Sequence, residues 1–190
     1  MKKKIIITGG LGYIGTELCK LYSGTSWHHE IIVVDNRFIS ERVNQIRNWN
    51  MEFIQGDILD KNLIKEHFKD ADVVHHLAGV TDVPRTKSET SNKKDELIKE
   101  VGVKGTQNIL DVISNKCKII FPSTHVVYEG IDEVKKDIQE DEKTKPVLSY
   151  SISKAINEDQ LKKSGKNYVI LRLGSVYGYS TDSMRIDIMP

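Results

Sequence analysis

The sequence has 190 residues, enough for one sizeable domain with a hydrophobic core of its own. Its 28 Lys and Arg nearly balance its 27 Asp and Glu, so the net charge gives no reason to expect binding to nucleic acid or to an anionic membrane. No stretch approaches the roughly 18 apolar residues of a membrane span, and the short apolar run after the first lysines is not a secretory leader. The two cysteines, Cys19 and Cys117, lie far apart and are interpreted as reduced core residues. Composition therefore predicts a soluble, cytoplasmic globular protein.

Short apolar runs rich in β-branched residues predict six strands. In chain order these are Lys4–Thr8, Ile31–Asp35, Glu52–Gln55, Asp72–Ala78, Lys118–Thr124 and Tyr168–Leu173. Near-continuous apolarity is typical of strands that are buried on both faces, as in a parallel sheet. Amphipathic segments between the runs predict helices over Tyr13–Tyr22, Ser40–Trp49, Lys61–Phe68, Lys93–Ile113 and Val147–Lys163. This alternation predicts a doubly wound, Rossmann-like α/β fold with a mostly parallel sheet.

The first predicted strand leads directly into the segment TGGLGYIG, Thr8–Gly15, whose spacing is typical of a phosphate-binding turn. Gly9 permits a tight turn, Gly12 lets a pyrophosphate approach the backbone, and Gly15 lets the helix pack closely on the strand. The helix that follows would offer free N–H groups and a positive dipole end to the phosphates. A glycine-rich turn without a ligand is the alternative. The strand before it and the helix after it favour a dinucleotide site.

An acidic residue, Asp35, ends the second predicted strand, twenty residues beyond Gly15. A carboxylate at this place accepts hydrogen bonds from the hydroxyl groups of the adenosine ribose and repels the 2′-phosphate of NADP. The sequence therefore predicts NAD as the cofactor. Arg37 lies close by and could offset this preference.

Polar residues that could act in catalysis follow the fifth predicted strand. Ser123 and Thr124 end that strand, and Tyr150 and Lys154 lie four residues apart in the next predicted helix, on one face of it. Such a Tyr-x-x-x-Lys match often arises by chance, so the pair alone would indicate a solvated helix face. The carboxyl ends of the strands form the binding edge of this fold, and that placement favours a catalytic pair.

Several motifs in the same order along the chain resemble the extended short-chain dehydrogenase/reductase family, in its NAD-dependent nucleotide-sugar epimerase/dehydratase branch. They are TGGLGYIG, Asp35, GDILD (Gly56–Asp60), HLAG (His76–Gly79), GVKGTQNIL (Gly102–Leu110), STHVVY (Ser123–Tyr128), PVLSYSISKAINE (Pro146–Glu158) and LRLGSVYG (Leu171–Gly178). The resemblance implies that Tyr150 is the catalytic acid and base, that Lys154 supports it and that Thr124 holds the reacting hydroxyl. It also implies a set of cofactor-binding residues: Gly9, Gly12, Tyr13, Ile14, Gly15, Asp35, Asn36, Asp57, Ile58, Leu77, Ala78, Gly79, Tyr150 and Lys154.

The activity that the resemblance implies is epimerisation of a nucleotide sugar, like that of UDP-glucose 4-epimerases. Tyr150 would take the proton of a sugar hydroxyl while the carbon delivers a hydride to NAD, and both would return to the other face of the sugar. The resemblance further implies a homodimer formed through the helices at 93–113 and 147–163. Paired His75 and His76, one facing each way, are expected to be core or sheet-end residues, because no third ligand is spaced to form a metal site with them.

Departures from the family pattern leave other functions open. His125 and Val126 replace the acid pair that usually follows Thr124 in the dehydratases, which disfavours 4,6-dehydratase activity. Gly102 and Ser175 replace asparagines, and Tyr179 replaces a proline. The expected organisation is an NAD-binding domain at 1–174 that carries the catalytic residues, followed at 175–190 by the start of a truncated substrate-binding region. The alternatives are an NAD-binding but catalytically impaired or truncated paralogue, and a nucleotide-sugar keto-reductase.

Overall fold

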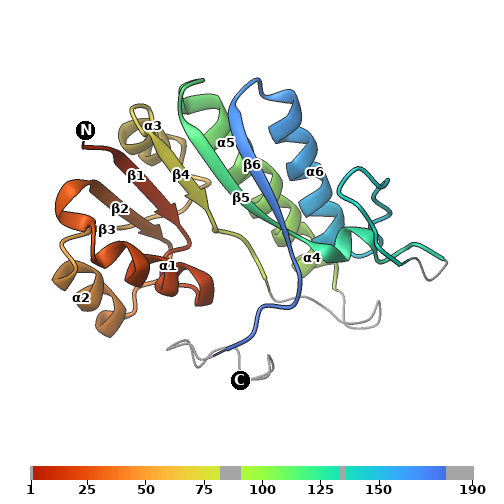
Figure 1. Cartoon of the computed structure of the whole chain (residues 1–190), viewed down its shortest axis with the longest axis horizontal. Coiled ribbons are helices and arrows are strands. Elements are labelled where there is room, and N and C mark those ends of the chain that lie inside the picture. The colour runs from red at the N-terminus through yellow and green to blue at the C-terminus, as the bar shows by residue number, and fades with distance from the viewer. Residues whose placement is uncertain (1, 82–90, 133–135, 179–190) are drawn as a thin grey trace.

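The computed structural model describes residues 2–81, 91–132 and 136–178, which form an α/β fold around one six-stranded sheet (Figure 1). The strands are β1 (Lys4–Thr8), β2 (Glu30–Asp35), β3 (Glu52–Gln55), β4 (Val73–His76), β5 (Lys118–Thr124) and β6 (Asn167–Leu173). Their order across the sheet is β3-β2-β1-β4-β5-β6, and every neighbouring pair is parallel. The direction of winding reverses between β1 and β4, which is where ligands bind in open sheets of this kind. The predicted doubly wound fold is confirmed.

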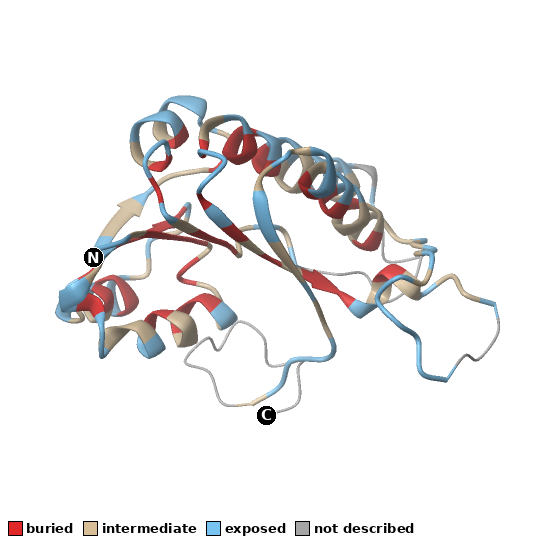
Figure 2. Cartoon of the chain, turned by 45° about the horizontal axis from the view of Figure 1, so that its top comes forward, coloured by how far each residue is buried: buried red, intermediate tan, exposed pale blue. Residues whose placement is uncertain are grey.

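Helices cover the sheet from both sides and form two separate cores (Figures 1 and 2). Helices α1 (Tyr13–Ser23) and α2 (Ser40–Asn48) pack on one face, over the half of the sheet that contains β1, β2 and β3. Helices α3 (Lys61–Phe68), α5 (Gly105–Val112) and α6 (Ser149–Lys163) pack on the other face. Successive residues of β1 serve both cores, since Ile5 and Ile7 belong to the first and Ile6 to the second. A strand buried on both faces explains the unbroken apolar run in the sequence.

Three predicted elements differ from the structure by more than a one-residue shift of an end. The expected helix at 93–113 is divided into α4 (Asn92–Lys99), a π-helical turn η3 (Glu100–Lys104) and α5. Helix α6 begins at Ser149, two residues later than predicted, because the N–H groups of Val147 and Leu148 bind the side chain of Glu129. Strand β4 ends at His76, two residues earlier than predicted, since the backbone beyond it turns toward Thr8.

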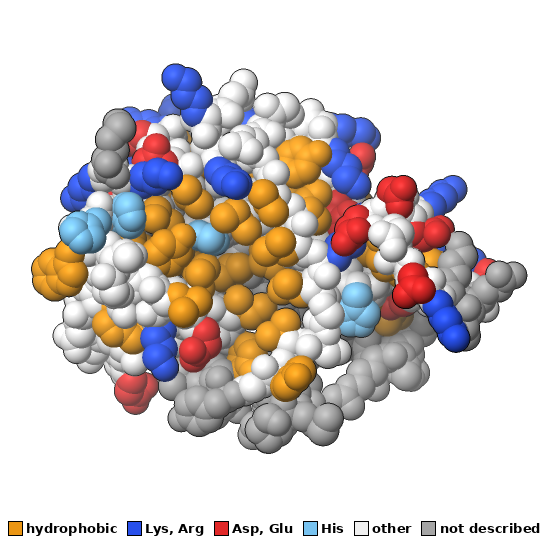
Figure 3. Space-filling model, in the orientation of Figure 1, with side chains coloured by type: hydrophobic (Ala, Val, Ile, Leu, Met, Phe, Trp, Pro, Cys, Tyr) orange, Lys and Arg blue, Asp and Glu red, His pale blue; other side chains and the backbone are white. Residues whose placement is uncertain are grey.

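The face of β5 and β6 that lies opposite α5 and α6 carries apolar side chains that are only partly covered by the described residues. Ile120 and Val169 are half-buried, and Leu171 is 42% exposed. Figure 3 shows hydrophobic side chains gathered over the middle of this side of the molecule. Both cysteines are free and buried, as expected. Among the described helices, none is both long and apolar enough to cross a lipid bilayer.

Candidate active site

The glycine turn between β1 and α1 lies against the segment that follows β4, and its glycines at positions 9 and 15 leave no room for a side chain. The Gly9 N–H donates to the carbonyl of Val34 at 2.7 Å, and Gly9 has a φ of +67°, which favours glycine. A Cβ atom at Gly9 would lie 2.8 Å from the backbone nitrogen of Ala78. A Cβ atom at Gly15 would lie 2.4 Å from the carbonyl oxygen of Gly9. The glycines predicted to shape a phosphate cradle therefore allow the close backbone approach that such a cradle needs.

Helix α1 begins directly after this turn, with Gly12 as its N-cap residue. Among the described residues, no side chain caps this end and the first turn carries no acidic residue. The free N–H groups of the first turn, which includes Tyr13 and Ile14, form the positive end of the helix dipole, and no acidic side chain of this turn neutralises it. A phosphate group fits this arrangement. The hydroxyl of Tyr13 also donates to the carbonyl of Gly178 at 2.5 Å, which brings the segment after β6 to the start of α1.

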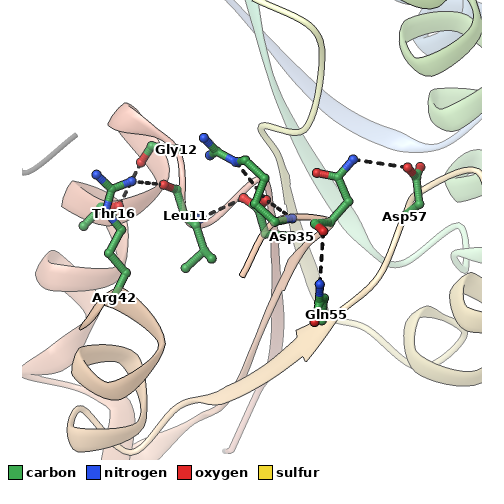
Figure 4. A network of polar contacts seen from close by, with 9 residues as sticks. Leu11, Gly12, Thr16, Asp35, Arg42, Gln55 and Asp57 are labelled. Atoms are coloured by element: carbon green, nitrogen blue, oxygen red, sulfur yellow. Dashed lines mark hydrogen bonds and ion pairs between the residues drawn. The ribbon is translucent and has the colours of Figure 1, made fainter. Parts of the chain in front are cut away.

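Asp35 is buried beside the glycine turn and fixes its shape (Figure 4). Its Oδ2 accepts the N–H of Leu11 at 3.0 Å, and its Oδ1 accepts the N–H of Arg37 at 3.0 Å and the Arg37 Nε at 3.3 Å. The guanidinium group of Arg42 donates to the carbonyl of Leu11 from the other side. The Asp35 carboxylate, which the sequence predicts to bind a ribose, thus also stabilises the glycine turn. Arg37 pairs with this same carboxylate.

Asn36 and Asp57 join the ends of β2 and β3 at the same edge of the sheet (Figure 4). The Nδ2 of Asn36 donates to the Oδ2 of Asp57 at 3.2 Å, and Asp57 Oδ1 accepts the N–H of Leu59 at 2.9 Å. Ile58 differs from its neighbours because its side chain is 4% exposed and belongs to the core beside α5. Its side chain therefore packs in the core, and its carbonyl accepts the Nδ2 of Asn108 at 3.1 Å.

The segment after β4 completes this side of the site. The N–H of Leu77 donates to the carbonyl of Thr8 at 3.2 Å, and the N–H of Ala78 donates to the Thr8 Oγ1 at 3.1 Å. Leu77 and Ala78 thus lie against the glycine turn, and Gly79 follows them. The residues predicted to bind the adenosine and phosphate parts of a dinucleotide lie just beyond the carboxyl ends of β1, β2, β3 and β4 or in the first turn of α1.

Lys154 and Tyr150 lie on α6, one turn apart, beside the end of β5. The Nζ of Lys154 donates to the carbonyl of Pro122 at 2.8 Å and lies 5.8 Å from the centre of the Tyr150 ring. Thr124 ends β5, and its Oγ1 accepts the N–H of Val126, which belongs to the short helix η4 (His125–Tyr128). The structure therefore brings Lys154 close to Tyr150 and places both beside the strand that carries Thr124.

The environment of Lys154 disfavours its charged form. Burial lowers the pKa of its ammonium group to about 8, although the negative charge of Glu158 acts in the opposite direction. The ammonium group also lies 4.4 Å from the centre of the Phe121 ring, where the aromatic face attracts a cation. Near neutral pH Lys154 is therefore mostly charged and can stabilise a neighbouring anion.

A buried ion pair that the sequence did not reveal links α6 to β5 and β6. Arg172 donates to both carboxylate oxygens of Glu158, from Nε at 3.0 Å and from the terminal nitrogen at 2.7 Å, and Ser123 Oγ donates to the same carboxylate at 2.5 Å. Burial on its own raises the pKa of Glu158, but the hydrogen bonds from Arg172 and Ser123 outweigh it and hold the pKa below its usual range. The ion pair fixes α6, and with it Tyr150 and Lys154, over the sheet.

Glu129 is a second residue that the sequence reasoning missed. Its Oε1 accepts the N–H groups of Val147 at 2.8 Å and Leu148 at 2.7 Å, and the hydroxyl of Ser151 also donates to it. Glu129 follows η4, so one carboxylate joins the turn after Thr124 to the first turn of the helix that carries Tyr150. The sequence offers no signal for this contact, because the cap is supplied by a residue about twenty positions away rather than by a local N-cap motif.

The paired histidines point to opposite faces of the sheet, as predicted. His75 Nε2 lies 2.8 Å from the Tyr22 hydroxyl on the side of α1, and His76 Nε2 lies 2.9 Å from the Thr106 hydroxyl on the side of α5. Within the described parts of the chain, no three His, Cys, Asp or Glu side chains gather closely enough to hold a metal ion. The histidines therefore belong to the packing of the sheet.

The chain is similar to known proteins over most of its length. A family model described as "NAD dependent epimerase/dehydratase family" matches residues 5–189. The UDP-N-acetyl-alpha-D-glucosaminuronate decarboxylase of Bacillus cytotoxicus is 33% identical over 94% of this chain and 56% of its own length. The dTDP-D-glucose 4,6-dehydratase of Dictyostelium discoideum is 30% identical over 93% of this chain and 44% of its own length.

A solved structure shows the same arrangement of elements. The UDP-glucose 4-epimerase of Thermus thermophilus, crystallised in complex with NAD, aligns with a TM-score of 0.75 and 26% identity, over 92% of this chain and 56% of that one. The chain thus spans about half the length of the relatives it matches. NAD is the cofactor of the matching family. With a family model that covers nearly all of its residues, the chain belongs to the NAD-dependent epimerase/dehydratase family.

Proposed function

We propose that the chain is the cofactor-binding and catalytic part of an NAD-dependent nucleotide-sugar epimerase. One observation carries the proposal: the glycine turn with Asp35, and the Tyr150–Lys154 pair beside Thr124, come from one sheet and lie at the carboxyl ends of its strands. This is the edge at which an α/β sheet binds its ligands. We propose that residues 1–174 form the NAD-binding domain and that residues 175–190 begin the substrate-binding region; residues 179–190 lie outside the described part.

The chain's own residues fit NAD. A side chain at Gly9 or Gly15 would collide with backbone atoms, a Cβ atom at Gly12 would lie 3.1 Å from the Gly9 carbonyl oxygen, and the uncapped first turn of α1 would hold the pyrophosphate. Asp35 would accept the hydroxyl groups of the adenosine ribose, with Asn36, Asp57 and the backbone of Ile58 beside the adenine. Leu77, Ala78, Gly79 and Lys154 would line the path toward the nicotinamide ribose. Bound NAD would supply a hydride acceptor that can also return the hydride.

Tyr150 would exchange the proton of the reacting hydroxyl. An ordinary phenol titrates near pH 10, so it acts as a base at neutral pH only if its anion is stabilised. Lys154, with its nitrogen 5.8 Å from the Tyr150 ring, would supply the stabilising positive charge. Thr124 would hold the substrate hydroxyl in place by a hydrogen bond. Removal of one proton from a sugar hydroxyl and its later return to the same oxygen is the proton balance that epimerisation requires.

Epimerisation is favoured over its alternatives by the residues that follow Thr124. Elimination of water needs both an acid and a base next to the reacting carbon. The positions after Thr124, where the dehydratases of the family usually carry two acidic residues, hold His125 and Val126, and valine cannot transfer a proton. The relatives include an epimerase, a dehydratase and a decarboxylase, so the substrate class of a nucleotide sugar is better supported than any single reaction. Net reduction of a keto-sugar, the third possibility, would consume one NADH for each product.

We also propose that two copies associate through α4, η3, α5 and α6. These helices lie side by side, and their outer surface exposes Leu97 and Ile156, at 48% and 39%. Apolar side chains on neighbouring helices are suited to burial against the same surface of a second copy.

The proposed function is tested with a panel of UDP-, GDP- and dTDP-sugars offered to the protein in the presence of NAD. We expect the unaltered protein to convert one of these sugars to its epimer without net formation of NADH. Tyr150→Phe should reduce turnover by roughly a thousandfold or more while NAD still binds, because only the proton-transferring group is removed. A phenylalanine variant with full activity would refute the assignment, and stoichiometric consumption of NADH would indicate the keto-reductase. A folded protein that binds NAD and converts none of the sugars would support the catalytically impaired alternative.

A further inference from the structure

A chain of buried hydrogen bonds with His76 at its centre runs beneath the glycine turn. The Thr8 Oγ1 lies 3.0 Å from the His76 Nδ1, and the His76 Nε2 lies 2.9 Å from the Thr106 Oγ1. All three side chains are at most 1% exposed, so water does not compete for these contacts. They connect β1, β4 and α5, three elements far apart in the sequence.

The groups at the two ends of this series of hydrogen bonds fix which atom donates in each of them. At one end the N–H of Ala78, which can only donate, lies 3.1 Å from the Thr8 Oγ1. At the other end the carbonyl of Gly102, which can only accept, takes the Thr106 hydroxyl proton at 2.6 Å. Thr106 has no second proton, so it accepts from His76, and the His76 proton must lie on Nε2. The bare Nδ1 of His76 then accepts the hydroxyl proton of Thr8.

A second, charged form of His76 would break this pattern. An imidazolium group would donate from both nitrogens, and the Thr8 hydroxyl proton would lose its acceptor inside the core. Burial, followed by the positive charge of Lys154, lowers the pKa of His76 to about 3. His76 is therefore neutral at physiological pH, which is the state that the hydrogen bonds require.

Each end of this series of hydrogen bonds also contacts a part of the proposed site. Ala78 packs against Gly9, where a Cβ atom would come within 2.8 Å of its nitrogen. The Gly102 carbonyl, in η3, accepts a further hydrogen bond from Asn157 Nδ2 at 3.0 Å, and Asn157 lies on α6 one turn beyond Lys154. These hydrogen bonds thus connect the glycine turn to the helix that carries Tyr150 and Lys154.

We infer that His76 is a positioning residue for cofactor binding, which through Thr8 sets the place of Ala78 against the glycine turn and through Thr106 and Gly102 ties that place to α6. The inference rests on the proposed function, in which the turn and Ala78 hold NAD. The hydrogen bonds of the Thr106 hydroxyl go to His76 and Gly102. An effect of this hydroxyl on NAD affinity would consequently have to pass through His76 or through α6.

The test compares the affinity for NAD of matched variants by calorimetry. Thr106→Val keeps the shape of the side chain but removes the hydroxyl, and Thr106→Ser restores it. We expect Thr106→Val to weaken NAD binding about five- to tenfold, the effect of one unpaired buried hydrogen bond. Thr106→Ser should bind within about twofold of the unaltered protein, because it keeps the hydrogen bonds. Tyr22→Phe is the control, because it removes the hydroxyl partner of the neighbouring His75 on the other face of the sheet, and it should leave the affinity unchanged.

The outcomes separate this inference from the proposed function. Equal NAD affinity of the unaltered protein and Thr106→Val, or an equal loss in Tyr22→Phe, would overturn the positioning role while NAD binding stands. No NAD binding by the unaltered protein would overturn the proposed function, and this inference with it. A second measurement does not depend on any variant: nitrogen-15 NMR of the unaltered protein should show His76 neutral, with its proton on Nε2. A proton on Nδ1, or a charged ring at neutral pH, would contradict the directions assigned to these hydrogen bonds.

Discussion

At the scale of single residues, the site combines groups that sequence spacing reveals with groups that only the folded chain brings together. The glycines, Asp35 and the Tyr150–Lys154 pair could be predicted, because the chemistry of each depends on a local spacing that the sequence displays. Glu129 and the Glu158–Arg172 pair could not, since each contact joins residues that are distant along the chain. Ile58 was predicted to lie in the cofactor site, but the sequence could not show that its side chain is buried, because this depends on the packing of α5.

Lys154 leads to a prediction for stability against pH. Its pKa falls from an ordinary 10.5 to about 8 in the folded protein, so between these values the unfolded chain binds more protons than the folded one. The free energy of unfolding should therefore rise with pH across this window, by on the order of 2 kcal/mol from this residue. Urea unfolding across this range, compared with Lys154→Met, measures the contribution, and we expect the rise to be smaller in the variant.

The matched control for this measurement is Lys163→Met, on the same helix. Lys163 is 75% exposed and pairs with Asp159 at the surface, so its removal should leave the pH dependence unchanged. Parallel curves for the unaltered protein and Lys154→Met would show that the ammonium group is not held in a desolvated site.

At the scale of secondary structure, the existence of every strand and of the main helices could be predicted, while the details at their ends could not. Apolar periodicity reports which segments are buried, and it therefore found all six strands. The π-helical turn η3 was missed, because it arises where Gly102 lets the backbone approach α6: a Cβ atom there would lie 2.3 Å from the Ser153 Oγ. Glycine at position 102, where the resemblance leads us to expect asparagine, thus leaves space for Ser153 of α6.

The cap that Glu129 supplies to α6 gives a prediction about this helix. Glu129→Ala would leave the N–H groups of Val147 and Leu148 without their acceptor, at a cost of about 1 kcal/mol. We expect hydrogen exchange of these two amides to accelerate roughly five- to tenfold, which corresponds to that free energy. Turnover should fall with it, because Tyr150 is in the first turn of the helix, and NAD affinity should change little.

Two further variants make the Glu129 prediction specific. Glu129→Gln keeps an oxygen acceptor and should restore most of the protection. Glu140→Ala removes an exposed carboxylate from the same connection, where the described contact is made by the main-chain carbonyl with Arg172, and should have no effect. Protection that is unchanged in Glu129→Ala would mean that the first turn of α6 does not depend on this carboxylate.

At the scale of the whole molecule, the alternation of elements is enough to predict a doubly wound parallel sheet with right-handed crossovers. The strand order β3-β2-β1-β4-β5-β6 could not be predicted in the same way, because other doubly wound orders obey the same rules. The division into a cofactor domain at 1–174 and a substrate region at 175–190 remains a prediction. The partial exposure of the apolar residues Ile120, Val169 and Leu171 could not be predicted, because a run that is apolar throughout looks the same whether one or both faces of the strand are covered.

The proposed dimer is a property of the same scale. Light scattering coupled to gel filtration should give twice the mass of one chain for the unaltered protein. Leu97→Asp should shift it to the monomer, because a charge would be placed in the apolar interface of the helices. Leu21→Asp, at a 79% exposed site on α1, is the control and should remain dimeric. If the unaltered protein is a monomer, the proposed dimer is refuted.

The central claim is that the glycine turn and Asp35 form a cradle for NAD. Equilibrium binding of NAD to the purified protein, after removal of any nucleotide that accompanies it, tests this claim most directly. We expect one NAD to bind per chain, and NADP to bind about tenfold more weakly or worse, because the Asp35 carboxylate would repel the extra phosphate. A folded protein that binds neither nucleotide, or that prefers NADP, would contradict the account.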